Sequence, residues 1–142
     1  MLPVASFISS ARWPRTLGCN VETSAYDEQR VLAQYLWHNY ANLFPSEHRE
    51  VMKALIGDAK ASVARDSLLV NRIRMIFGST AAGKVAEQLS DGESAFQKRA
   101  CEQLLTNHPS EIAINRCPRC TRIVRTPEAK QCLWCGHDWH AA

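Results

Sequence analysis

A mainly α fold is predicted for this chain of 142 residues: a small antiparallel helical bundle followed by a short C-terminal β module. Three observations support that prediction. Apolar residues recur at helical spacing through most of the segment from residue 23 to residue 108. Short loops separate these stretches, as in bundles of antiparallel helices. The helical pattern then stops, and four of the six cysteines fall between residues 115 and 140.

Capping residues, breakers and apolar spacing place the elements in order. Residues 1–22 have no period and are expected to form a flexible N-terminal arm. The helical domain spans residues 23–108, and its helices are expected at about 23–43, 46–63, 66–78, 81–89 and 94–106. The C-terminal module spans residues 111–142 and is expected to contain a short strand at 111–114 and a hairpin of 122–125 with 130–131. No internal repeat is expected.

The C-terminal cysteines have the spacing of a tetrahedral metal site. They form two Cys-x-x-Cys pairs, Cys117 with Cys120 and Cys132 with Cys135, separated by eleven residues. Two thiolates three residues apart can face one ion when the backbone turns tightly between them, and two such turns complete a tetrahedron of sulfur. Because a module of this size cannot bury enough apolar surface to fold alone, the metal must contribute folding free energy.

Other uses of these cysteines fit less well. Disulfides need an oxidising compartment, and the sequence shows no convincing export signal, which favours a cytoplasmic protein. A thioredoxin-like redox centre uses one Cys-x-x-Cys near a βαβ unit, whereas this chain has two pairs in a predicted hairpin. Zinc is the expected ion, and iron suits the same four thiolates. A thiol redox function would require that the metal be absent or labile.

The two cysteine pairs resemble the knuckles of a zinc ribbon. Cys117-Pro118-Arg119-Cys120 and Cys132-Leu133-Trp134-Cys135-Gly136 look like the two halves of a rubredoxin-like site of four cysteines, as in the tails of uncharacterised bacterial zinc-ribbon proteins. The resemblance covers about the last fifth of the chain, and it departs from the commonest pattern by placing Thr121 after the first knuckle. It implies a β zinc ribbon, and because ribbons serve transcription, translation and scaffolding alike, it implies little about function.

Basic residues gather in the same module. The formal net charge of the whole chain is only +3, yet Arg119, Arg122 and Arg125 recur at every third position around the predicted hairpin. Arginines on a rigid, metal-held loop suit contacts with phosphate, and Trp134 could stack on a base. The alternatives are a solvated basic surface and a tryptophan that packs the ribbon against itself or against the helical bundle.

Catalytic signals are weak. Residues 78–85 nearly spell a P-loop, but Val85 stands where the loop needs a Ser or Thr hydroxyl for Mg²⁺. A helix that ends at Gly78, followed by a new helix, explains the same residues. No nucleophile–base pair or open three-ligand metal site is apparent, so we expect no enzyme. No apolar run has the length of a membrane span, so no membrane partner is expected.

Two functions therefore remain open. The first is a zinc-held binding module for nucleic acid, which would use the arginines beside the first knuckle. The second is a protein-interaction or structural adaptor, with the ribbon docked on another protein or on the helices. The partner, the oligomeric state and the packing of ribbon against helices do not follow from the sequence.

Overall fold

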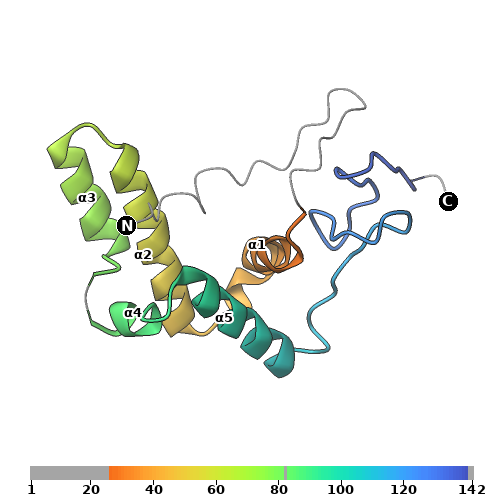
Figure 1. The fold of residues 1–142 in the computed structure, drawn as a ribbon, viewed down its shortest axis with the longest axis horizontal. Coiled ribbons are helices and arrows are strands. Elements are labelled where there is room, and N and C mark those ends of the chain that lie inside the picture. The colour runs from red at the N-terminus through yellow and green to blue at the C-terminus, as the bar shows by residue number, and fades with distance from the viewer. Residues whose placement is uncertain (1–25, 82, 141–142) are drawn as a thin grey trace. The chain divides into compact units, whose positions relative to one another are not determined.

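The computed structural model describes residues 26–81 and 83–140. The predicted N-terminal arm, residues 1–22, lies outside them. The described residues are mainly helical, and a helical bundle fits their element order (Figure 1). The elements are α1 (Glu28–Tyr40), the 3-10 turn η2 (Ala41–Leu43), α2 (Ser46–Val63), α3 (Ser67–Phe77), α4 (Gly83–Gln88) and α5 (Glu93–Asn107).

Local capping explains where the helices begin and end. The side chain of Asp27 accepts a hydrogen bond from the N–H of Arg30 at the start of α1, several residues later than predicted. The side chain of Asp66 accepts from the N–H of Leu68 at the start of α3. Gly78 ends α3 with a φ of 79°, a conformation that glycine adopts readily. The P-loop-like stretch is therefore a helix end followed by the short helix α4.

The chain divides into two compact units. The described part of the first comprises residues 44–81 and 83–100, and that of the second comprises residues 26–43 and 101–140. Helix α1, which the sequence assigns to the helical domain, thus belongs to the same unit as the C-terminal cysteines. No described helix has the length and apolar character needed to cross a membrane.

In the first unit, α2 and α3 form a helical hairpin joined by residues 64–66 (Figure 1). Gly57 lets the two helices approach closely, because a Cβ built there would lie 2.4 Å from the Cβ of Phe77. A glycine that weakens the helical pattern in the sequence is therefore a packing contact in the structure. Apolar side chains at the centre of this unit are buried, among them Phe44, Val51, Ala54, Leu55, Phe96 and Ala100.

In the second unit, α1 buries Val31, Ala33, Tyr35 and Leu36. The C-terminal module contains no strand among the residues that the structure describes, so the predicted strand at 111–114 and hairpin of 122–125 with 130–131 are not seen. Instead there are two isolated antiparallel bridges, Arg116 with Ile123 and Gln131 with Asp138. Each cysteine pair turns its own flanking residues back on themselves, so the pairing stays within a knuckle.

Candidate metal centre

Two backbone knuckles of the same design build the candidate metal centre. In the first knuckle (residues 115–124), the N–H of Cys117 donates to the carbonyl of Arg122, at 3.0 Å, and the N–H of Thr121 donates to Cys117, at 2.9 Å. In the second knuckle (residues 130–139), the N–H of Cys132 donates to His137, at 2.8 Å, and the N–H of Gly136 donates to Cys132, at 2.9 Å. Every second-knuckle position lies fifteen residues after its counterpart, the separation of Cys117 from Cys132.

The correspondence extends through each knuckle. A third backbone bond closes both, from the N–H of Val124 to Asn115 and from the N–H of Trp139 to Lys130. The residue after each second cysteine has a left-handed backbone, with φ of 61° at Thr121 and 72° at Gly136. The expectation of no internal repeat is therefore wrong for the C-terminal module. The repeat is one of backbone geometry, which a comparison of side chains overlooks.

The four sulfurs lie where a tetrahedral ion would place them. The Sγ atoms of Cys117, Cys120, Cys132 and Cys135 all lie within 4.8 Å of one another. The Sγ atoms of Cys117 and Cys135 are 3.7 Å apart, and those of Cys120 and Cys132 are 3.6 Å apart. A tetrahedron with metal–sulfur bonds of about 2.3 Å has sulfurs about 3.8 Å apart. The donor set therefore fits one metal ion shared by both knuckles.

The protein environment around the sulfurs favours a bound cation. The Sγ of Cys117 accepts from the N–H of Arg119, and the Sγ of Cys132 accepts from the N–H of Trp134, both at 3.4 Å. Such bonds stabilise thiolates. Without a cation, burial raises the pKa of the Cys132 thiol to about 12 and also raises the pKa of Cys120. Raised pKa values favour the protonated thiols. A bound metal ion would favour the thiolates instead, because a coordinating thiol is deprotonated.

Polar side chains of α1 hold the chain that leads into and out of the first knuckle. The buried hydroxyl of Tyr35 donates to the carbonyl of Ala113, at 2.7 Å, and accepts from the N–H of Asn115. The hydroxyl of Tyr40 accepts from the N–H of Ala113, at 3.1 Å. The amide of Asn39 donates to the carbonyl of Arg125, at 3.1 Å. These bonds satisfy backbone groups that no strand satisfies.

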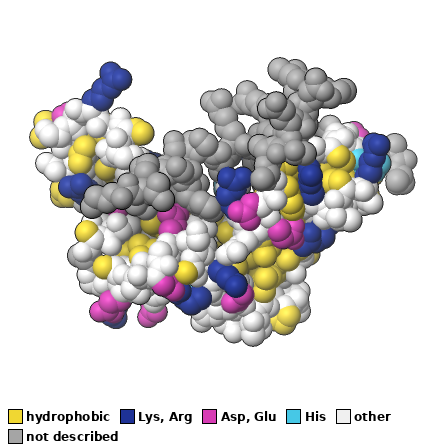
Figure 2. Space-filling model, in the orientation of Figure 1, with side chains coloured by type: hydrophobic (Ala, Val, Ile, Leu, Met, Phe, Trp, Pro, Cys, Tyr) yellow, Lys and Arg dark blue, Asp and Glu magenta, His cyan; other side chains and the backbone are white. Residues whose placement is uncertain are grey.

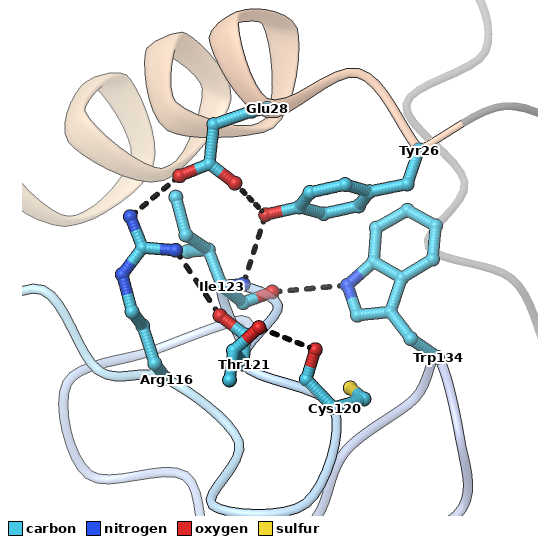
Figure 3. Close-up of polar contacts among 7 residues, drawn as sticks. All are labelled: Tyr26, Glu28, Arg116, Cys120, Thr121, Ile123 and Trp134. Atoms are coloured by element: carbon cyan, nitrogen blue, oxygen red, sulfur yellow. Dashed lines mark hydrogen bonds and ion pairs between the residues drawn. The ribbon is translucent and has the colours of Figure 1, made fainter.

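The start of α1 makes a second set of contacts with the first knuckle (Figure 3). The hydroxyl of Tyr26 donates to the carboxylate of Glu28 and accepts from the N–H of Ile123, at 3.1 Å. Glu28 in turn pairs with Arg116, whose guanidinium also donates to the carbonyl of Thr121. Burial and the bond to Glu28 raise the pKa of Tyr26 to about 12, whereas Arg116 lowers the pKa of Glu28. The first knuckle is thus attached to α1 through side chains as well as through its backbone.

The structure gives different surroundings to the residues predicted to contact nucleic acid. Arg119 and Arg125 are exposed, and neither pairs with an acidic side chain in the described part of the chain. The guanidinium of Arg122 lies over the rings of Tyr26 and Trp134, 5.3 and 5.9 Å from their centroids. The indole N–H of Trp134 donates to the carbonyl of Ile123, at 2.9 Å, and its ring packs edge-on against Tyr26. These contacts favour packing within the protein, rather than stacking on a base, as the role of Trp134.

Docking of the C-terminal module on the helices was one of the alternatives left open by the sequence, but the particular contacts with α1 were not predicted. Tyr35 and Tyr40 fit the apolar face of a helix. No neighbouring residue indicates that their hydroxyls bind the backbone at residue 113, which is 78 residues beyond Tyr35. The one available signal is composition, because α1 places Tyr35, Asn39 and Tyr40 within two turns.

Comparison with known proteins adds no relative. No protein-family model, no curated protein and no solved structure matches the chain. The function is therefore argued from the candidate metal centre and its surroundings alone.

Proposed function

We propose that the chain is a zinc-held, non-enzymatic binding module whose C-terminal knuckles contact the phosphate backbone of a nucleic acid. In this proposal the ion has a structural role. Four cysteine sulfurs are a closed ligand set, which is typical of structural zinc and leaves no open position for a substrate. Elemental analysis of protein purified without chelators should find one zinc per chain. Iron in its place would contradict the assignment and indicate electron transfer.

The observation that carries the nucleic-acid part is the difference among the four arginines of residues 116–125. Arg116 is paired with Glu28 within the protein, whereas Arg119 and Arg125 are exposed and lack an acidic partner among residues 26–81 and 83–140. Exposed arginines on a backbone fixed by metal and by α1 are preorganised for phosphate contacts. Arg122 lies against two aromatic rings, so we assign it to shaping this surface together with Trp134.

The test is a binding titration with fluorescent single-stranded and double-stranded oligonucleotides over a range of salt concentrations. Changing Arg119 and Arg125 to Ala should weaken binding at every sequence tested. The slope of log affinity against log salt should fall by about 1.4 to 1.8, corresponding to two lost phosphate contacts. Unaltered affinity in this double variant, or no binding of the native chain at low salt, would contradict the proposal.

A matched control is available in α3. Changing Arg72 and Arg74 to Ala removes the same charge from exposed positions in the other compact unit. This variant should bind the oligonucleotides as the native chain does. An equal loss of affinity in both double variants would indicate an unspecific effect of net charge.

The second candidate function is a structural or protein-interaction adaptor. The contacts of residues 26–40 with residues 113–125 favour it, because they use the module to hold a helix of the same chain. Protein binding that survives nuclease treatment and is lost when the second cysteine pair is mutated would support this candidate.

A further inference from the structure

Helix α3 leaves one apolar face uncovered in the part of the chain that the structure describes. None of its residues is buried. Leu68, Leu69, Met75 and Ile76 are 69%, 49%, 86% and 61% exposed. Large apolar patches are uncommon on monomeric proteins unless they bind something. Figure 2 shows hydrophobic side chains at the surface over the α2–α3 hairpin.

The exposed side chains form a stripe at helical spacing. Residues 68, 69, 72, 75 and 76 lie on one side of an α-helix, and Phe77, on the other side, packs at Gly57 of α2. We call Leu68, Leu69, Arg72, Met75 and Ile76 the α3 face. Arg72 lies at its centre, with a pair of apolar residues toward each end of the helix. Arg74 lies about 200° around the helix from Arg72, away from the face.

The charge of the α3 face restricts its occupant. Residues 67–77 contain two arginines and no acidic residue. A second copy docked by two-fold symmetry around the middle of the stripe would bring Arg72 against its own counterpart, which like-charge repulsion disfavours. A bilayer would receive the apolar side chains but would place the central guanidinium toward hydrocarbon, which is unfavourable. A protein surface that supplies a carboxylate satisfies Arg72 and covers the leucines, Met75 and Ile76 together.

We propose that the α3 face binds an acidic amphipathic helix of a partner protein. The apolar side of that helix covers Leu68, Leu69, Met75 and Ile76, and one of its carboxylates pairs with Arg72. Two helices packed in this way use apolar anchors one turn apart, the usual mode of recognition between amphipathic helices. This interaction is independent of the metal centre and of the proposed binding of nucleic acid.

The probe is a labelled amphipathic peptide of leucine and glutamate, compared with the same peptide carrying lysine at every glutamate. The native full-length chain should bind the acidic peptide in a fluorescence anisotropy titration, and about tenfold more tightly than the lysine peptide. Arg72→Glu should weaken binding of the acidic peptide by about tenfold and strengthen binding of the lysine peptide. Met75→Ser should weaken binding of both peptides, because each covers the same apolar side chains.

Two controls separate the α3 face from general attraction of charge. Arg74→Glu makes the same charge change on the same helix outside the face, and it should leave peptide binding unaltered. The variant with Arg119 and Arg125 changed to Ala should also keep it, which distinguishes this surface from the C-terminal module. Circular dichroism establishes that each variant is folded.

Several results would overturn the proposal. Equal binding of the two peptides, no binding of the acidic peptide, or an equal loss in Arg74→Glu would each do so. A native dimer that Met75→Ser dissociates in sedimentation experiments would identify a second copy as the occupant. Binding to anionic phospholipid vesicles that Met75→Ser abolishes would identify a membrane surface.

Discussion

The first and second knuckles have the same backbone conformation and differ in the residues that surround it. Corresponding hydrogen bonds close both, and both place a residue with left-handed φ after the second cysteine. The first knuckle has Thr121 at that position and is held by Tyr26, Glu28 and residues farther along α1. The second has Gly136 there, and its Cys135 is exposed. The strained Thr121 thus lies in the knuckle whose backbone is bonded by the side chains of Tyr26 and Arg116, and the other knuckle has glycine at that position.

The largest effect should come from removing the feature that the two knuckles share. Cys132→Ser, or treatment with a strong chelator, should remove the metal and unfold both knuckles, since structural zinc contributes about 10–16 kcal/mol of apparent binding free energy in small domains. Amide exchange should then speed up in residues 115–124 as well as in 130–139. The control Cys101→Ser removes a buried thiol outside the cluster and should keep the metal. A first knuckle that stays protected without metal would contradict a shared ion.

A smaller effect should come from exchanging the residues with left-handed φ. Gly136→Ala should destabilise the metal-loaded chain by about 1–2 kcal/mol, because alanine is strained there even though nothing lies within 4 Å of its Cβ. Thr121→Gly should stabilise it by about 0.5–1 kcal/mol, because relief of strain exceeds the added entropy of the unfolded chain. Denaturant unfolding measures both changes. Destabilisation by Thr121→Gly would show that its side-chain contacts outweigh the strain.

The hydroxyl of Tyr26 binds the backbone of the first knuckle, whereas its ring packs against Trp134 of the second. Tyr26→Phe keeps the ring against Trp134 and removes the hydroxyl bonded to Ile123 and Glu28, so we expect a loss of about 1 kcal/mol. The native state raises the pKa of Tyr26 from 10.0 to about 12, chiefly by burial. The stabilisation is therefore complete below pH 10 and is lost as the pH rises toward 12.

Tyrosinate absorbance measures this titration. The difference between the native chain and Tyr26→Phe should titrate near pH 12. A difference spectrum that titrates at the ordinary value of 10.0 would show that Tyr26 is not held against α1 and the first knuckle.

The smallest effect should come from Arg116→Gln, which gives the first knuckle the residue that the second has at Gln131. The ion pair with Glu28 joins two side chains that are 45% and 48% exposed. Its loss should reduce stability by less than about 1 kcal/mol. The reduction should shrink further at high salt, because screening weakens the native pair. A larger loss that salt does not alter would show that the bond from Arg116 to Thr121 is the more important contact.

The same comparison explains what could be predicted from the sequence. Helix α3 begins and ends where Asp66 and Gly78 indicate, since capping depends on residues a few positions apart. The four cysteines meet as their spacing predicts, because each Cys-x-x-Cys is a local turn. The predicted β hairpin of 122–125 with 130–131 is not seen, because residues 123 and 131 pair within their own knuckles, with residues 116 and 138.

Contacts between residues far apart in the chain could not be predicted from the sequence. His48, which has the polarity of a surface residue, is buried, and its ring lies edge-on to that of Phe96, with 5.5 Å between centroids. The hydroxyls of Tyr35 and Tyr40 likewise acquire partners only when α1 meets residue 113. Local patterns report where a helix lies, but they do not report which backbone groups its polar atoms will satisfy.

The uneven burial of the four cysteine residues has a consequence for chemical reactivity. Cys117 and Cys132 are 1% and 0% exposed, Cys120 is intermediate, and Cys135 is exposed to solvent. An alkylating agent, an oxidant or a competing chelator therefore meets Cys135 first. Detaching that one sulfur should open the second knuckle, while the hydroxyls of Tyr26 and Tyr35 still bind the backbone of the first. Release of the ion should thus follow a fixed order of ligand loss, with its rate set by attack at Cys135.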